Sequence, residues 1–186
     1  MSSFRACCKL LASLSEYQYT RKAWKKEAME LLLDPQFFQM DLPSLQHWKA
    51  TTENLMTHDK ITFKDLMAKL SSISAGGGGL SIFSSKEQEL ETRAQLLKRL
   101  AFVIFCSQND QYQKQMPDIQ ERLAESLRTI PSSPAVQSAV FLCFRVILIR
   151  MSPHHVTSLW PLIITEMVII FSYLEQELST DTEEWK

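Results

Sequence analysis

The sequence predicts an all-α protein in which antiparallel helix pairs stack as in HEAT or armadillo repeats. Apolar residues recur at helical spacing along most of the 186 residues, and no stretch sustains the apolar–polar alternation of a strand. Asn-Gly and Asp-Gly hairpin turns are absent, and short proline-marked turns separate about eight helical segments. Because no clean sequence period emerges, a compact irregular helical bundle is the alternative.

Residues 1–70 are expected to form N-terminal helical hairpins. Trp24 lies on the apolar stripe of the second helix, which ends at Asp34-Pro35 because a residue before proline disfavours helical geometry. The third helix is expected to begin near Pro43, and the fourth follows Asp59, a good N-cap residue. The first helix has a stripe at i, i+3, i+4 and i+7, formed by Phe4, Cys7, Cys8, Leu11 and Leu14.

Residues 71–85 are expected to form a flexible linker, which contains every glycine of the chain, at Gly76–Gly79. Such a run is typical of an engineered replacement for a longer loop, and a natural low-complexity linker is the alternative. Neither is a phosphate-binding loop, because no strand precedes the run and no Lys-Ser or Lys-Thr follows it. The linker ends in a capping box, Ser85-Lys86-Glu87-Gln88, which predicts the start of the next helix.

Residues 86–178 are expected to form C-terminal helical hairpins that pack on the first part as one domain. Ser133-Pro134 and Ser152-Pro153 each combine an N-cap serine with a proline suited to the first helical turn. Each pair therefore predicts the start of a long helix. Pro161 would then lie inside the last helix and kink it.

The most apolar stretches, Val140–Ile149 and Leu162–Leu174, are expected to be buried core helices. Arg145 interrupts the first stretch and Glu166 the second, so both fall short of the roughly 20 apolar residues that span a bilayer. Glu166 is expected to reach the edge of its helix or to pair with Arg145 or Arg150. Five side chains on apolar stripes are predicted to lie in the core: Trp24, Phe105, Phe144, Trp160 and Met167.

The bulk composition excludes several classes of protein. Hydrophobic residues make up 45% and charged residues 22% of the chain, which is ordinary for a globular protein and not for a disordered one. A net charge of −1 argues against nucleic acid as a partner. Residues 1–30 carry six Lys or Arg against three Glu, and the chain closes on an acidic tail at 179–186. No signal peptide is expected at the N-terminus.

No catalytic, metal or cofactor site is expected. The four histidines, at positions 47, 58, 154 and 155, have no second ligand at metal-site spacing, and no nucleophile or nucleotide motif occurs. The cysteines form no C-x-x-C pair and fall on apolar helical patterns, which favours reduced, buried thiols in a cytosolic protein. Palmitoylation of Cys7 and Cys8 is the less favoured alternative.

The most specific local feature is a group of basic residues in the second helix. On a helical wheel Lys22, Lys25 and Lys26 share one face opposite Trp24, so the lysines are expected to point to solvent. An anionic lipid headgroup or an acidic segment of a partner would relieve the mutual repulsion of these lysines. The N–H groups at the start of the helix would add hydrogen bonds to the phosphates of a headgroup. The alternative is that the lysines form a solvated helix face. The candidate lipid- or anion-binding residues are Arg21, Lys22, Lys25 and Lys26, with Lys9 and Arg5 of the preceding helix.

The sequence also resembles the C-terminal region of Dopey proteins. The resemblance covers most of the chain outside the linker and the acidic tail, and it rests on four segments: Phe4–Asp41, Leu55–Met67, Arg93–Arg128 and Phe144–Val168. Within these segments, runs such as AWKKE (Ala23–Glu27), PQFFQMD (Pro35–Asp41), PDIQERL (Pro117–Leu123) and SLWP (Ser158–Pro161) occur in order. Gly76–Gly79 departs from the pattern of the family, which favours an engineered linker.

The resemblance implies a piece of a very large peripheral protein on the cytoplasmic face of Golgi and endosome membranes. Dopey proteins act in traffic between these membranes with a large partner, Mon-two, and are linked to phosphoinositides, a lipid flippase and kinesin. The expected function is a non-catalytic adaptor or scaffold module that binds a phosphoinositide such as phosphatidylinositol 4-phosphate, a protein partner, or both. The alternative is a structural C-terminal cap of a long helical solenoid, with no ligand of its own.

Overall fold

The computed structural model of the chain describes residues 3–58, 60–74, 86–128 and 133–179. Within these ranges the chain is helical and contains no strand, which confirms the predicted all-α fold. Five short 3-10 helices, η1 to η5, lie in the turns. The eight α-helices are α1 (Ser3–Ser15), α2 (Arg21–Leu33), α3 (Leu42–His58), α4 (Lys60–Ser74), α5 (Lys86–Cys106), α6 (Met116–Leu127), α7 (Pro134–Arg150) and α8 (Trp160–Ser179).

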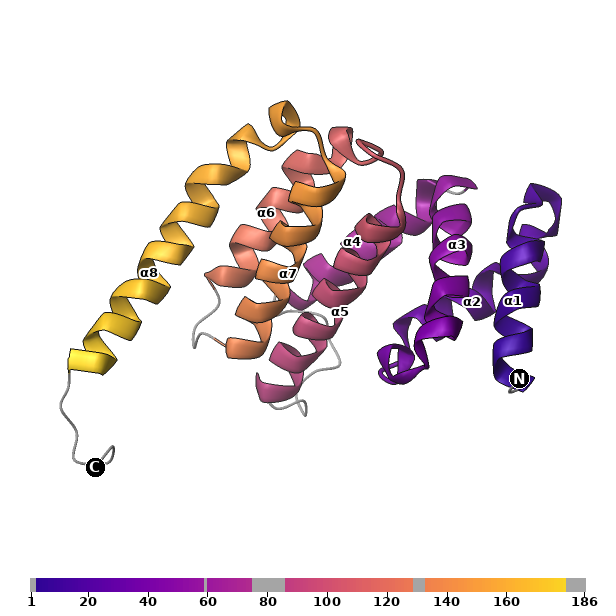
Figure 1. Ribbon diagram of the computed structural model, residues 1–186, viewed down its shortest axis with the longest axis horizontal. Helices are drawn as coiled ribbons and strands as arrows, with labels where there is room; N and C mark the ends of the chain where they lie inside the picture. The colour runs from indigo at the N-terminus through magenta and orange to yellow at the C-terminus, as the bar shows by residue number, and fades with distance from the viewer. Residues whose placement is uncertain (1–2, 59, 75–85, 129–132, 180–186) are drawn as a thin grey trace.

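Alternate helices lie side by side, as in helical-repeat proteins. α3 packs against α1 and α5, α5 packs most extensively against α7, and α4 packs against α6. α5 and α7 run in the same direction (Figure 1), and hydrogen bonds connect their C-terminal ends. The Arg150 guanidinium donates to the Ser107 carbonyl, and the Asp110 amide donates to the Arg150 carbonyl at 3.0 Å. Figure 1 shows the resulting stack, with α1 at one end and α8 at the other, in agreement with the predicted repeat module.

A buried arginine ties α2 to α5. Arg99 is 1% exposed, and its guanidinium donates to the carbonyls of Leu32 at 3.2 Å, Asp34 at 2.6 Å and Gln95 at 3.0 Å. Leu32 and Asp34 stand at the C-terminal end of α2, where unpaired carbonyls favour a positive charge. These acceptors replace the water that the buried cation loses. The core around it includes Trp48, Leu55, Leu66, Leu97, Leu100, Ile104, Ile119, Leu123 and Ile147.

The two serine–proline pairs behave differently. Ser133 caps α7 as predicted, because its hydroxyl accepts from the amide of Val136. The prediction that Ser152 starts a long helix is wrong. Its amide and hydroxyl donate to the Asp110 carboxylate, and the chain continues as η4 (Pro153–His155) and η5 (Thr157–Leu159). α8 begins at Trp160, so Pro161 lies in the first turn, where a proline fits without a kink. The Asp59 cap and the start of the Ser85 capping box lie outside the described residues.

Two of the five predicted core side chains are buried and three are not. Trp24 is 7% and Phe144 2% exposed, as predicted. Phe105 is 42% exposed because it lies on the outer face of α5, where the Lys49 ammonium stands 5.2 Å from its ring. Trp160 and Met167 are 43% and 41% exposed because they lie on α8, which packs little against the rest of the chain.

The two apolar stretches also differ. α7 buries Val140, Cys143, Phe144 and Ile147, so the prediction of a core helix at 140–149 is confirmed. The same prediction for 162–174 is wrong, because Ile163 is the buried residue of α8 and the helix makes its main contacts with η5. Thr157–Ser179 is long and apolar enough to cross a bilayer by length and composition alone, contrary to our estimate from the interrupted stretch. The expected ion pair of Glu166 with Arg145 or Arg150 does not form between these described residues.

Candidate interaction surfaces

Two of the three lysines of α2 lie as their spacing predicts. Trp24 is buried, and its indole N–H donates to the Thr20 hydroxyl at 3.0 Å, which fixes the rotation of the helix. Lys22 and Lys26 are exposed on the opposite side. The Nζ of Lys26 also lies 3.9 Å from Oε1 of Glu30, and this ion pair is weak because both side chains are exposed. Lys25 is half-buried and has an interaction partner of its own, so Lys22 and Lys26 are the lysines best placed to meet an external anion.

Two of the other candidate residues are used within the fold. Arg5 of α1 pairs with Asp41, with its Nε 3.1 Å from Oδ2. The hydrogen bond from Ser44, together with Arg5, holds the pKa of Asp41 below its usual value. Arg21 donates to the carbonyl of His58 and thereby closes the C-terminal end of α3. Lys9 is exposed on α1, which packs on α3. Two of the six candidate residues, Arg5 and Arg21, therefore already have partners within the fold.

The backbone amide of the first residue of α2, which was expected to help bind an anion, is already used within the fold. η1 (Gln18–Thr20) runs directly into α2, and the Arg21 amide donates to the carbonyl of Gln18. The Thr20 hydroxyl turns back and donates to the carbonyls of Leu14 and Tyr17. An anion at α2 would consequently rely on the lysine side chains.

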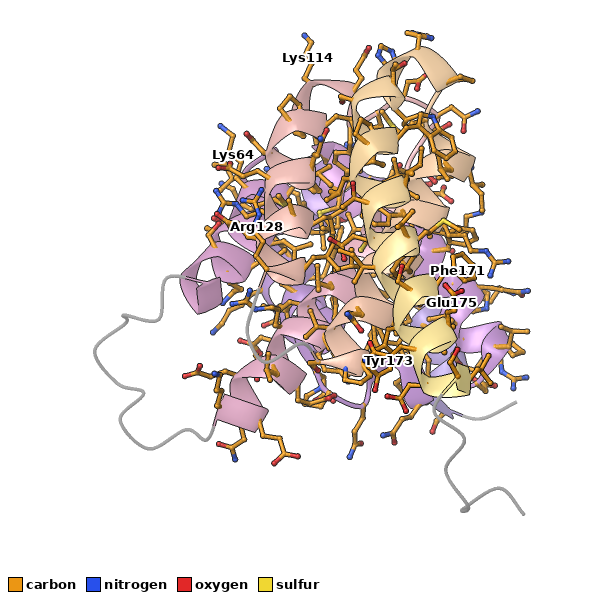
Figure 2. All side chains as sticks on the ribbon, turned by 90° about the vertical axis from the view of Figure 1, so that its left-hand side faces the viewer. Lys64, Lys114, Arg128, Phe171, Tyr173 and Glu175 are labelled. Carbon is orange, nitrogen blue, oxygen red and sulfur yellow. The ribbon has the colours of Figure 1, made fainter. Side chains whose placement is uncertain are left out.

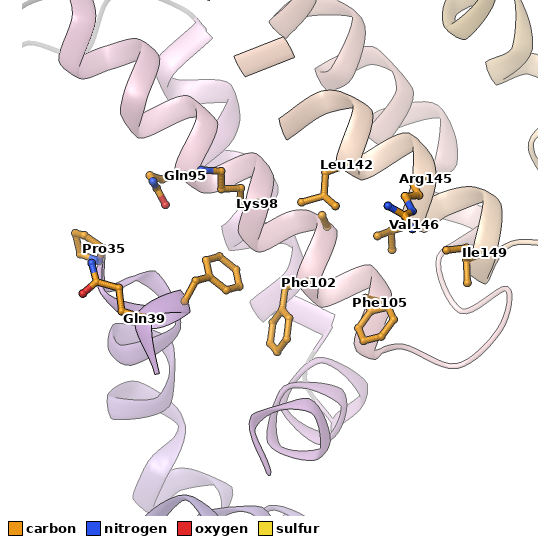
Figure 3. Close-up of a pocket in the computed structure, with 12 residues that line it drawn as sticks. Pro35, Gln39, Gln95, Lys98, Phe102, Phe105, Leu142, Arg145, Val146 and Ile149 are labelled. Carbon is orange, nitrogen blue, oxygen red and sulfur yellow. The ribbon is translucent and has the colours of Figure 1, made fainter. Parts of the chain in front are cut away.

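A groove on the face made by η2 (Phe37–Gln39), α5 and α7 was not foreseen from the sequence (Figure 3). We call it the aromatic groove, and its volume is about 590 Å³. Phe38 and Phe102 lie in it with ring centroids 5.8 Å apart in an edge-on arrangement, a favourable geometry for aromatic pairs. The other lining residues are Pro35, Gln39, Gln95, Lys98, Ala101, Phe105, Leu142, Arg145, Val146 and Ile149.

The aromatic groove is bordered by positive charge. Lys98 and Arg145 line it from α5 and α7, and no acidic side chain is among the described lining residues. The Arg99 guanidinium lies 4.8 Å from the ring centroid of Phe38, and the Lys49 ammonium lies 5.2 Å from the ring centroid of Phe105. The groove thus combines an apolar floor with cations along its length.

The second surface missed from the sequence is the outer face of α8. Six large apolar side chains are spaced 4-3-4-3-4 along it and are between 41% and 84% exposed. This spacing is typical of a helix that packs against another helix. Figure 2 views the molecule from this side and shows α8 at the front. The residues, which we call the α8 stripe, are Trp160, Ile164, Met167, Phe171, Leu174 and Leu178.

The four cysteines, which were expected to be buried, differ in their exposure. Cys8, Cys106 and Cys143 are buried free thiols, and burial raises the pKa of Cys106 and of Cys143 to about 12. Cys7 is exposed on α1, which contradicts its expected burial, because the outer side of that helix is uncovered. In the described part of the chain, no group of three or more His, Cys, Asp or Glu is arranged to hold a metal ion.

Comparison with known proteins identifies the family. A family model described as DOP1 C-terminal matches residues 2–186. A DOP1 homolog of Drosophila melanogaster is 61% identical over 97% of the chain, pad-1 of Caenorhabditis elegans 50% over 97%, and DOP1B of Mus musculus 49% over 97%. The chain spans about 7% of the length of these relatives. No solved structure matches it. The chain therefore belongs to the DOP1, or Dopey, family and represents its C-terminal region.

Proposed function

We propose that this chain is a non-catalytic module of a membrane-traffic scaffold and that it binds anionic phosphoinositides, such as phosphatidylinositol 4-phosphate, through the lysines of α2. Family membership supports the role in traffic. The observation that carries lipid binding is the exposure of Lys22 and Lys26 on the side of α2 opposite buried Trp24. Their backbone is fixed by core packing, so the lysines face solvent without reorganisation of the fold.

The expected strength is that of reversible recruitment. A basic residue near an anionic membrane contributes about 1 kcal/mol, so Lys22 and Lys26, with exposed Lys9 of α1, would supply a few kcal/mol. Because the charges of Lys22 and Lys26 are exposed, salt should weaken the interaction sharply; screening acts beyond about 8 Å at physiological ionic strength. Arg5 and Arg21 have partners within the fold and are left out of the proposed contact.

We place the module at the cytoplasmic face of Golgi and endosome membranes as a peripheral protein. A large partner of the Mon-two type is proposed to bind the full-length protein, with kinesin or a lipid flippase as further candidates. The resemblance to Dopey proteins supports these assignments. The chain represents about 7% of the length of its relatives, so each partner needs a binding assay with this chain alone.

The test is flotation of the purified chain with vesicles of phosphatidylcholine, with and without phosphatidylinositol 4-phosphate. The double variant Lys22→Glu/Lys26→Glu should lose most of the bound fraction. Lys64→Glu/Lys114→Glu is the matched control, because both lysines are exposed, project from other parts of the molecule (Figure 2) and carry the same change in charge. Equal binding by the parent and the α2 variant would reject the proposal.

The structural-cap alternative is not favoured by α8. A terminal cap of a solenoid needs a polar outer face to keep the end of the stack in solution. The last helix of the chain instead exposes the α8 stripe, including Phe171 at 60% and Leu178 at 84% exposure. A module whose last described helix exposes this much apolar surface is better suited to binding than to shielding.

A further inference from the structure

We propose that the aromatic groove binds an amphipathic helix of a partner protein whose large apolar side chains are flanked by carboxylates. This interaction goes beyond the proposed lipid binding, because it uses η2, α5 and α7 and none of the lysines of α2. Three features of the aromatic groove lead to this occupant: its shape, the fixed position of its aromatic rings, and its charge.

The shape fits about two to three turns of a helix. Gln95 and Phe105 stand at opposite ends of the lined part of α5, and ten residues of helix correspond to about 15 Å. Partner helices that dock in grooves present anchors at i, i+3 or i+4 and i+7, which extend over about 10 Å. The volume of about 590 Å³ is within the range of specific binding sites.

The floor is fixed before any partner arrives. Phe102 packs edge-on against both Phe37 and Phe38. Its ring centroid lies 5.4 Å from that of Phe37, which is 3% exposed. Phe38 in turn lies against the guanidinium of Arg99, which three backbone carbonyls hold in place. A rigid aromatic floor loses little conformational entropy on binding, and this favours a specific docking site over a passive apolar patch.

The charge indicates the chemistry of the partner. Neither Lys98 nor Arg145 forms an ion pair with a described residue, and the two come from different helices on the border of the aromatic groove (Figure 3). Lys49 adds a third cation beside Phe105. One lipid headgroup would meet cations at a single point, whereas carboxylates on successive turns of a helix meet several along its length. Complementary charge of this kind selects partners as well as adding affinity.

The experiment uses two synthetic stapled peptides as probes. Both carry leucine, phenylalanine and leucine at i, i+4 and i+7; one has glutamates at the flanking positions and the other has lysines. Fluorescence anisotropy with the purified chain should show roughly tenfold tighter binding of the glutamate peptide. Lys98→Glu/Arg145→Glu should reverse this preference, and Phe105→Ala should weaken both peptides. Lys64→Glu/Lys114→Glu, which changes net charge equally but lies away from the groove, should leave the preference unchanged.

Several results would overturn the proposal. They are equal binding of the two peptides, no binding of either, or the same shift in the control variant. If Lys98→Glu/Arg145→Glu instead abolishes binding to phosphatidylserine vesicles, the groove serves a lipid. If the parent chain sediments as a dimer and the same variant as a monomer, the groove serves a second copy. Circular dichroism checks that each variant is folded. None of these results bears on the α2 lysines, so the two proposals fail separately.

Discussion

Replacing Arg99 with methionine tests whether a buried cation holds α2 against α5. The substitution keeps most of the side-chain volume but removes the donors to the carbonyls of Leu32, Asp34 and Gln95. A buried acceptor left without a partner costs about 1–3 kcal/mol. Two such acceptors at the end of α2, partly offset by the apolar methionine, give a loss of about 3 kcal/mol in the free energy of unfolding.

The assay is thermal unfolding followed by circular dichroism. A chain of this size should melt roughly 6–12 °C lower for that loss, at about 2–4 °C per kcal/mol. Arg99→Lys should lie between the parent and Arg99→Met, because an ammonium cannot reproduce the fork of the guanidinium. Lys98→Met is the control, because it removes a charge from the half-exposed residue next to Arg99. It should change the free energy of unfolding by about 0.5 kcal/mol at most. A melting temperature within about 2 °C of the parent for Arg99→Met would refute the reasoning.

Three further outcomes follow from burial. Trp48→Ala should cost about 3–5 kcal/mol because Trp48 is 2% exposed, whereas Trp160→Ala should cost about 1 kcal/mol in urea unfolding. A thiol reagent at pH 8 should label exposed Cys7 rapidly and the other cysteines only on unfolding. Burial raises the pKa of Cys106 to about 12, against 9.0 for a free thiol, so the thiol stays neutral in the folded chain. The contribution of this neutral thiol to the free energy of unfolding is complete below pH 9 and is lost as the pH rises towards 12, as alkaline unfolding would show. Ile164→Ser/Phe171→Ser should leave the melting temperature unchanged but reduce binding of an apolar dye, because both side chains lie on the exposed α8 stripe.

Helical periodicity predicted the elements of this fold well because each core helix carries an apolar stripe. The stripe of α2 correctly placed Trp24 in the core and Lys22 and Lys26 outside. Periodicity cannot state whether a partner helix lies within the same chain, however. α8 has the apolar pattern of a core helix, and only the structure shows that Met167 and Trp160 have little to pack against.

The aromatic groove lay beyond sequence reasoning for a different reason. Its lining comes from three segments, around Phe38, Phe102 and Leu142, that lie far apart along the chain. None of these segments carries a recognisable motif. The use of Arg5 and Arg21 within the fold was also hidden, because Asp41 and the carbonyl of His58 are brought to them by tertiary packing. Helix-wheel arguments identify which residues share a face, but not which of them already have partners.

Binding at each of the three exposed surfaces should respond differently to salt, and this difference would allow a binding activity to be assigned to one of them. Binding through Lys22 and Lys26 would depend on exposed charge, so their contribution should nearly vanish at 1 M salt, where the screening length is about 3 Å. Binding through the α8 stripe would depend on burial of apolar surface, which salt does not screen. The aromatic groove combines both and should keep part of its affinity. Membrane binding that persists undiminished at 1 M salt, and is lost in Ile164→Ser/Phe171→Ser, would therefore move the lipid contact from α2 to α8.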